Sequence, residues 1–241
     1  MKIFLAGATG VIGRRLTPLL IAAGHAVSGS SRSADKARML KKQGAQAVVV
    51  DVFEAKALRD AVAAVRPDVV IHQLTDLPQV LDPARRGEAL IRNARLRIEG
   101  AANLVAAAQA AGARRLIAQS IAFIYADGPE PHAESDPLAP AEGDDLNAVT
   151  ARGVRALEDA TLHTPGLDGI VLRYGRLYGP GTWFEAPSGR APLHVDAAAQ
   201  AALLAVTRGG PGIYNIAEDD GAVLIDKARR ELGFDPAFRL K

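Results

Sequence analysis

Short apolar runs alternate with helix-like segments along most of this chain, and this alternation is the strongest constraint on its fold. Strands are expected at 2–6, 25–30, 45–51, 66–73, 113–120, 167–175 and 211–219. Helices are expected at 11–24, 34–44, 54–65, 86–112, 147–162 and in the second half of 192–206. Nearly continuous apolar strands are typical of a parallel sheet that is buried on both faces. We therefore predict an α/β fold, a doubly wound parallel sheet (Rossmann fold).

The first strand-to-helix connection carries three glycines. The stretch GATGVIG spaces Gly7, Gly10 and Gly13 three residues apart. In a doubly wound sheet this connection lies at the switch point, where ligands bind. Glycines let the backbone approach a phosphate, and the helix N-terminus favours negative charge. The loop lacks the Lys-Ser/Thr pair of a Walker loop, which disfavours an NTPase; the simpler alternative is a glycine-rich turn needed only for packing.

Composition excludes several classes of function. The formal net charge of +2 is too small to indicate a nucleic-acid partner or an anionic membrane surface. The chain has no cysteine, which excludes disulfides and thiolate chemistry, and its 5 histidines are scattered, so we expect no metal site. No apolar run approaches the roughly 20 residues of a membrane span, and the N-terminus does not read as a secretory signal. We expect a cytoplasmic protein.

Four segments carry a family resemblance. In chain order they are GATGVIG, RPDVVIHQLTD, LIAQSIAFIYA and VLRYGRLYGPG. Together they resemble the extended or atypical short-chain dehydrogenase/reductases, the NAD(P)-dependent epimerase/dehydratase group, over residues 1–181. The resemblance implies an NAD(P)-binding Rossmann domain at 1–175, with the dinucleotide pyrophosphate over the glycine loop. Residues 176–241 are expected to form a reduced C-terminal substrate lobe and to complete the sheet.

The end of the second strand indicates which dinucleotide is bound. An acid there binds the ribose hydroxyls of NAD, whereas a basic residue accommodates the 2′-phosphate of NADP. This chain has Ser31, Arg32 and Lys36 and no acid at the strand end, although Asp35 could still reach a ribose. Arginine can bind a phosphate through two hydrogen bonds. We predict NADP in preference to NAD.

The resemblance also assigns further cofactor contacts. Three of these residues lie in the glycine loop. Two lie at the end of the third strand and are expected to flank the adenine, and three lie at the end of the fourth strand and are expected along the pyrophosphate and ribose. The last three, at the end of the sixth strand, are expected near the nicotinamide. Ser120 is expected beside the cofactor as well. In chain order the assigned residues are Thr9, Val11, Ile12, Asp51, Val52, Gln73, Leu74, Thr75, Tyr174, Gly175 and Leu177.

The usual catalytic motif of the family is missing. Family members use a Tyr in a YxxxK motif as general acid/base, and the Lys lowers the pKa of that Tyr. The corresponding stretch, LNAVTARGVRALEDA, places Thr150 and Val154 at the Tyr and Lys positions if Glu158 is the glutamate that commonly follows. No YxxxK occurs elsewhere in the chain, and Arg97 replaces the usual Asn of the fourth helix. Of the family set only Ser120 remains.

Three interpretations of this loss stay open. Other groups could act: Ser120 orients the substrate oxygen, Tyr125 donates the proton, and Arg97 or Arg152 supplies positive charge, with the loop residue His132 a weaker candidate. Alternatively, water or the substrate supplies the proton during hydride transfer. Finally, the protein could be a non-catalytic NADP(H)-binding regulator or redox sensor, or more remotely a flavin or nucleotide binder.

The predicted function is that of an NAD(P)-dependent oxidoreductase or sugar-epimerase/dehydratase-like enzyme. It is expected to act by hydride transfer on a small carbonyl or hydroxyl substrate, which could be a sugar derivative. Trp183, Phe184 and Arg190 are candidate substrate contacts, with surface packing as the alternative.

Two further expectations concern structure. Asp196 is a candidate N-cap for the helix that follows it, and His194 is expected to be structural. The helices at 86–111 and 147–162 have small apolar faces, and in the family such helices form a homodimer interface, so a homodimer is expected.

Overall fold

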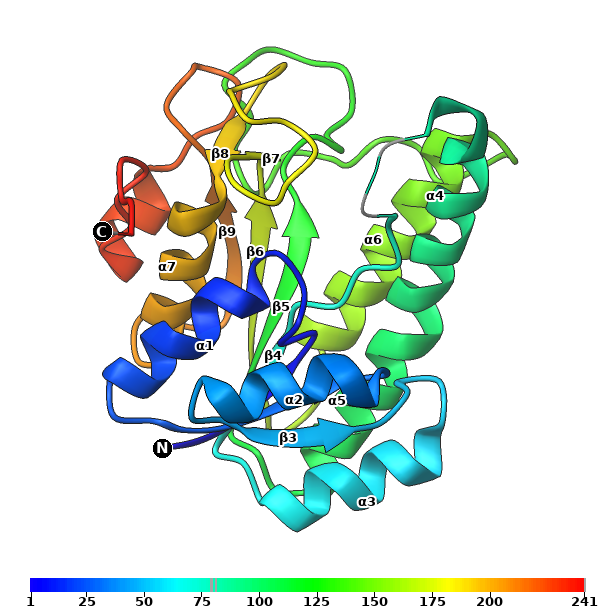
Figure 1. Ribbon diagram of the computed structural model, residues 1–241. Coiled ribbons are helices and arrows are strands. Elements are labelled where there is room, and N and C mark those ends of the chain that lie inside the picture. The colour runs from blue at the N-terminus through cyan, green and yellow to red at the C-terminus, as the bar shows by residue number, and fades with distance from the viewer. Residues whose placement is uncertain (79, 81, 241) are drawn as a thin grey trace.

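The computed structural model describes residues 1–78, 80 and 82–240, and it contains a seven-stranded sheet with helices on both faces (Figure 1). Its order is β3-β2-β1-β4-β5-β6-β9, and every neighbouring pair is parallel. The strands are β1 Lys2–Ala6, β2 Ala26–Ser31, β3 Gln46–Val49, β4 Val69–His72, β5 Arg115–Ile121, β6 Asp168–Tyr174 and β9 Gly212–Ile216. The prediction of a doubly wound parallel sheet is confirmed.

Helices divide between the two faces of the sheet. Figure 1 shows α1 and α7 on one side and α4 and α6 on the other. Alternation along β1 explains the two cores, because Ile3 and Leu5 join the cluster under α1 and α7, whereas Phe4 and Ala6 join the opposite one. The helices are α1 Gly13–Ala22, α2 Ala34–Lys42, α3 Ala55–Val65, α4 Arg86–Arg95, α5 Ala101–Ala110, α6 Leu146–Leu162 and α7 Val195–Ala205. Within the described residues, no helix has both the length and the hydropathy needed to cross a bilayer.

The direction of winding reverses between β1 and β4. The chain runs outward from β1 through β2 to β3, and α3 then returns it to β4 on the other side of β1. The loops that follow these two central strands therefore diverge to opposite faces of the sheet. This reversal opens a crevice at the carboxyl ends of the strands, the usual ligand site of such folds.

The long helix predicted at 86–112 is interrupted. A short 3₁₀ turn, Pro83–Arg85, leads into α4, and a π-helical turn, Leu96–Gly100, separates α4 from α5. Gly100 lies close to the segment that follows β3, since a Cβ there would approach Val52 Cγ1 to 3.0 Å. Periodicity predicted the helix but could not show the π turn. A π turn changes the direction of the side chains that it carries.

Residues after 176 contribute to two sheets. Strand β9 pairs with β6 at the edge of the main sheet, and β7 (Arg176–Tyr178) pairs in parallel with β8 (Pro192–His194) in a small second sheet. A second π-helical turn, Ala228–Leu232, follows. The division into 1–175 and 176–241 remains a prediction.

The N-cap of α7 differs from the expected one. His194, not Asp196, precedes the helix, and its Nδ1 accepts a hydrogen bond from the Asp196 backbone N–H at 3.2 Å. Asp196 lies in the first turn instead, where its carboxylate binds Arg15 of α1 at 2.7 Å. The prediction of Asp196 as N-cap was wrong by two positions. The local sequence does not show that the carboxylate of Asp196 pairs with Arg15, which is distant in the chain.

Candidate functional site

A cleft of about 1270 Å³ runs along the carboxyl ends of the central strands. One end is formed by the glycine loop and the end of β2, and the other by α4, the segment after β5 and residues 182–191. The structure therefore brings the predicted cofactor loop and the predicted substrate contacts to one continuous cleft. Among the described residues, no group of three or more His, Asp or Glu side chains could hold a metal ion.

The glycine loop is shaped by close contacts that exclude side chains. Gly7 has φ +84°, and a Cβ there would lie 2.5 Å from the Gln73 carbonyl oxygen of β4's continuation. A Cβ at Gly13 would lie 2.3 Å from the carbonyl oxygen of Gly7, and the Gly10 N–H donates to that same oxygen at 3.0 Å. The loop thus presents backbone at the N-terminus of α1, an arrangement that fits a dinucleotide pyrophosphate.

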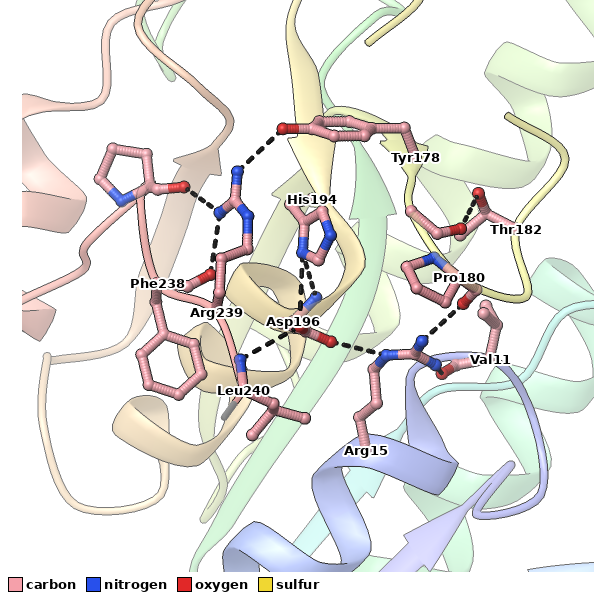
Figure 2. Close-up of polar contacts among 12 residues, drawn as sticks. Val11, Arg15, Tyr178, Pro180, Thr182, His194, Asp196, Phe238, Arg239 and Leu240 are labelled. Atoms are coloured by element: carbon pink, nitrogen blue, oxygen red, sulfur yellow. Dashed lines mark hydrogen bonds and ion pairs between the residues drawn. The ribbon is translucent and has the colours of Figure 1, made fainter. Parts of the chain in front are cut away.

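Helix α1 is fixed to the C-terminal part of the chain by one arginine (Figure 2). The Arg15 guanidinium donates to the carbonyl oxygens of Val11 at 3.1 Å and Pro180 at 2.5 Å, and it pairs with Asp196. The second carboxylate oxygen of Asp196 accepts the Leu240 backbone N–H at 3.1 Å. These contacts hold the start of α1, and with it the glycine loop, in place.

The end of β2 presents hydroxyls and cations to the cleft. Ser31, Arg32 and Lys36 all line it, and the hydroxyl of Thr9 donates to Ser31 Oγ at 3.3 Å. Asp35 does not line the cleft and instead pairs with Arg38 at 2.6 Å. Within residues 30–36 the carboxylate of Asp35 does not reach the cleft wall, whereas Asp76 on that wall pairs with Arg32 at 3.5 Å.

Most other predicted cofactor contacts also reach the cleft, but three do not. Gly13 packs behind the loop, the Asp51 carboxylate accepts the Phe53 backbone N–H at 3.0 Å, and Ser120 is buried elsewhere. Those on the wall are Thr9, Gly10, Val11, Ile12, Val52, Gln73, Leu74, Thr75, Tyr174, Gly175 and Leu177, together with Gly7, Ser31 and Arg32.

Ser120 does not face the cleft. Its hydroxyl is fully buried and donates to Glu158 Oε1 of α6 at 2.6 Å. Its neighbours Gln119 and Ile121 line the cleft, because successive side chains of a strand point to opposite faces. This geometry favours a structural role for Ser120 and leaves an aliphatic side chain where an oxygen-orienting hydroxyl was expected.

Tyr125 borders the cleft, but its hydroxyl is engaged. The phenol donates to Asn215 Oδ1 at 2.6 Å and accepts a hydrogen bond from Arg173 Nη1 at 2.9 Å. Its ring stacks on His132 with 4.9 Å between ring centroids, and His132 in turn contacts Asp136. Burial raises the pKa of Tyr125 despite the opposing effect of Arg173. Tyr125 is thus a neutral phenol held inside a hydrogen-bond network.

The corner that carries YxxxK in the family is aliphatic here. Thr150 lines the cleft, but its hydroxyl donates to the Leu146 carbonyl oxygen of its own helix at 2.7 Å. Val154 is fully buried in an apolar cluster with Ile121 and Leu138. Neither position offers a free acid or base to the cleft.

The two arginines considered as cations lie in different places. Arg152 donates to the carbonyl oxygens of Ala141 and Gly143, and it is not on the cleft wall. Arg97 is on the wall, in the π turn, and is only 7 % exposed. The sequence showed that Arg97 is an unusual residue for its position, but not that it is buried.

The three predicted substrate contacts all line the cleft. The Trp183 indole N–H donates to the Pro78 carbonyl oxygen at 2.9 Å, which joins two walls of the cleft, and Phe184 lies beside it. Arg190 forms an ion pair with Glu130. Phe123, which was not among the residues predicted from the sequence, also lines the cleft and carries the Arg176 guanidinium 4.4 Å above its ring. Its position next to the IYA segment could have indicated it.

Comparisons with known proteins agree with this geometry. Residues 3–192 match the NAD dependent epimerase/dehydratase family. A 3-diazoavenalumate denitrifying reductase from a Streptomyces species is 42% identical over an alignment of 242 positions, and the alignment covers 92% of this chain and 77% of that protein.

Solved structures show the same fold. UDP-glucose 4-epimerase of Thermotoga maritima, solved with UDP-glucose, has a TM-score of 0.79 at 18% identity. The match covers 99% of this chain and 94% of the epimerase chain. Yeast methylglyoxal/isovaleraldehyde reductase, solved with NADPH, has a TM-score of 0.74 at 16% identity. The match covers 98% of this chain and 94% of the reductase chain.

Proposed function

The chain belongs to the NAD dependent epimerase/dehydratase family, and from that premise we propose that it is an NADPH-dependent reductase that works without a Tyr–Lys pair. Membership makes it a nicotinamide-dependent enzyme of the oxidoreductase and epimerase type. The preference for NADPH rests on Ser31, Arg32 and Lys36 at the end of β2. The bound cofactor supplies hydride.

One observation carries this proposal. The cleft keeps a backbone cradle at Gly7 and Gly10, yet the corner expected to exchange protons consists of Ile121, Val154 and a Thr150 hydroxyl bonded to its own helix. Reduction of a carbonyl needs a proton on oxygen, which enzymes usually supply from a positioned acid. The aliphatic corner therefore favours a reaction in which hydride alone completes the product.

Loss of dinitrogen is such a reaction. The relative that is 42% identical is named a denitrifying reductase of a diazo compound. For an arenediazonium ion, hydride forms a C–H bond, the C–N bond breaks, and its electron pair leaves with N₂. The charges balance, because a cation and a hydride give a neutral arene and N₂, and no proton is consumed. We propose an aromatic diazo compound as the substrate class.

The chain's own residues suit an aromatic substrate. Phe123, Trp183 and Phe184 line the cleft, each with about two-fifths of its surface exposed. Large aromatic side chains that converge on a cleft are typical of sites for planar apolar ligands. The Trp183–Pro78 hydrogen bond joins the 182–190 segment to the opposite wall of the cleft.

The test is enzymatic turnover with isotopic tracing. The purified protein is mixed with NADPH and a diazotised aminobenzoate, and NADPH oxidation and N₂ release are followed against a no-protein control that measures the uncatalysed reaction. With NADPH deuterated at the transferred position, the product should carry deuterium at the former diazo carbon. With unlabelled NADPH in D₂O that carbon should carry hydrogen. Binding of NADPH without turnover on diazo or carbonyl compounds would support the regulator instead.

Carbonyl reduction or sugar epimerisation is the second candidate. Tyr125 favours it, because this phenol borders the cleft and accepts a hydrogen bond from Arg173, a cation that stabilises phenolate. A panel of aldehydes, ketones and nucleotide sugars distinguishes it from diazo reduction. The two candidates also differ in what they require of Tyr125.

We also propose a homodimer through α4 and α6. Ile91 and Ile98 are 55 % and 44 % exposed, seven residues apart on the α4 side of the molecule, and Leu146 at the start of α6 is 38 % exposed. Exposed aliphatic side chains on neighbouring helices favour a protein partner. Light scattering after size exclusion should give a dimer for the wild type and a monomer for Ile91→Glu.

A further inference from the structure

Arg97 is a buried cation without an anionic partner. It lines the cleft and is 7 % exposed, and among the described residues no carboxylate lies within 4.0 Å of its guanidinium. No side chain or carbonyl group of that part of the chain accepts a hydrogen bond from it either. Buried charges are normally paired, so this one requires an explanation.

The carboxylate whose charge acts on Arg97, that of Glu158, is occupied by another arginine. Both carboxylate oxygens of Glu158 bind Arg173, at 2.9 and 2.7 Å, and one also accepts the hydroxyl of Ser120. Asp76, on the cleft wall, pairs with Arg32 at 3.5 Å and with Arg92 at 3.7 Å. The buried set under this part of the cleft therefore has one positive charge in excess.

Nor does His72 balance that charge. Its ring is buried, neither ring nitrogen has a hydrogen-bond partner among the described residues, and burial together with the charge of Arg97 lowers its pKa to about 4. Histidine 72 is therefore neutral at physiological pH. Burial also lowers the pKa of Arg97 to about 10, which leaves this guanidinium charged.

Arg97 is carried by an irregular turn of the helix. The residue lies in the π-helical turn Leu96–Gly100 between α4 and α5. A π turn inserts one residue into a helix, has i→i+5 hydrogen bonds in place of i→i+4 bonds, and is found frequently at functional sites. In this turn Arg97 lies on the buried side, whereas Ile98 is 44 % exposed.

We propose that Arg97 binds the carboxylate of an aromatic substrate. A guanidinium presents paired N–H donors that match a carboxylate. Phe123 and Trp183 supply apolar wall in the same cleft for the ring. The proposal rests on the proposed function in that it places the substrate in this cleft, and it adds the chemical group that the site selects.

The cofactor has its own cationic and backbone partners. Its pyrophosphate fits the glycine loop before α1, and its 2′-phosphate fits Arg32 and Lys36. Arg97 belongs to the helix layer on the opposite face of the sheet, where Leu96 joins the second core cluster. The anion that Arg97 lacks is therefore assigned to the substrate.

The test compares an acid with its uncharged ester. Calorimetry on wild-type protein saturated with NADP⁺ measures the affinity for 4-hydroxycinnamate and for methyl 4-hydroxycinnamate. We expect the acid to bind about 10- to 100-fold more tightly. Arg97→Gln should remove this preference, Arg97→Lys should keep part of it, and the exposed control Arg95→Gln should keep all of it.

A wild type that binds the acid no more tightly than the ester, or not at all, overturns the proposal even if every Arg97 variant fails to fold. A folded Arg97→Gln that keeps the preference also overturns it. Because NADP⁺ permits no reduction, the result does not depend on the proposed reaction. A protein that reduces diazo compounds without preferring acids refutes this inference alone, and one that prefers acids but reduces nothing refutes the proposed function alone.

Discussion

Arg173 and Glu158 form a buried ion pair with two hydrogen bonds, Nε–Oε1 at 2.9 Å and Nη2–Oε2 at 2.7 Å. Both side chains are almost fully inaccessible, and the hydroxyl of Ser120 binds the same carboxylate. The pair joins α6 to β6 directly beneath the cleft. It explains why Ser120, although it lies on the expected strand, belongs to the interior and not to the cleft wall.

Replacing Glu158 by Ala should destabilise the protein strongly. Removal of one member of a buried pair leaves the other charge unpaired, which costs about 3–5 kcal/mol. Asp159→Ala removes a neighbouring carboxylate that is exposed, and it should change the free energy of unfolding by about 0.5 kcal/mol or less. Urea denaturation of both variants measures the difference, and equal effects would contradict the assignment.

Tyr125→Phe distinguishes the two candidate reactions. If hydride transfer needs no acid from the protein, the kcat should change by about threefold or less, whereas loss of a general acid lowers rates by about 10²–10⁴. The variant leaves Asn215 and Arg173 without their phenol partner, so the free energy of unfolding should fall by about 1–3 kcal/mol. Steady-state kinetics and urea denaturation measure the two effects separately.

Gly7→Ala should impair cofactor binding as well as stability. Its new Cβ would lie 2.5 Å from the Gln73 carbonyl oxygen, so the loop must move away from β4. Gly24→Ala is a matched control, because Gly24 has a similar φ of +81° but open space around it. The control should lose about 1–2 kcal/mol from backbone strain alone and bind NADPH normally. A Gly7 variant with unchanged NADPH affinity would show that the loop is only a turn.

Arg32→Ala should weaken NADPH more than NADH. Loss of a charged hydrogen-bond donor to the 2′-phosphate should raise the Kd for NADPH about tenfold or more, with the Kd for NADH almost constant. Arg38→Ala, which removes a charge that is paired with Asp35 outside the cleft, serves as the control. Fluorescence titration of the wild type and both variants with each cofactor gives the six constants, and an equal loss for both cofactors in Arg32→Ala would exclude the 2′-phosphate contact.

Stability should fall with pH below about 6.5 because of His72. Burial lowers its pKa from 6.5 to about 4 in the folded protein. Between these values the unfolded chain binds a proton that the folded protein does not, so the free energy of unfolding decreases as pH falls. The total is on the order of 3 kcal/mol. Urea denaturation from pH 4 to 8 should show this difference between wild type and His72→Gln, and not between wild type and the exposed-site variant His163→Gln.

Much of the fold could be predicted from the chain because its strands and helices differ in periodicity and are separated by glycines. Gly24, Gly44 and Gly112 each follow a helix with positive φ, and each marks a predicted boundary. The π turn could not be predicted, since Leu96–Gly100 continues the apolar period of a normal helix. The three-residue strands β7 and β8 could not be predicted either, because each forms by pairing with the other and not from its local sequence.

The parts of the candidate site that backbone conformation determines could be predicted from the sequence. The parts that depend on the direction of a side chain could be predicted less well. The glycine loop and the end of β2 were located from spacing and charge. Ser120 was placed on the right strand but its direction was not foreseen, because a shift of one residue in a strand reverses the face. Arg97 was visible as a substitution, but its missing partner depends on Arg173 having taken Glu158, which joins segments distant in sequence.

The carboxylate of Asp196 has a consequence for how the protein can be handled. One oxygen holds Arg15 at the start of the glycine-loop helix, and the other holds the backbone N–H of Leu240. Any displacement of the segment at Leu240 therefore acts on the same carboxylate that holds Arg15 at the start of α1. Probes meant to report on the glycine loop without disturbing it therefore belong on α3, across the molecule from this contact (Figure 1).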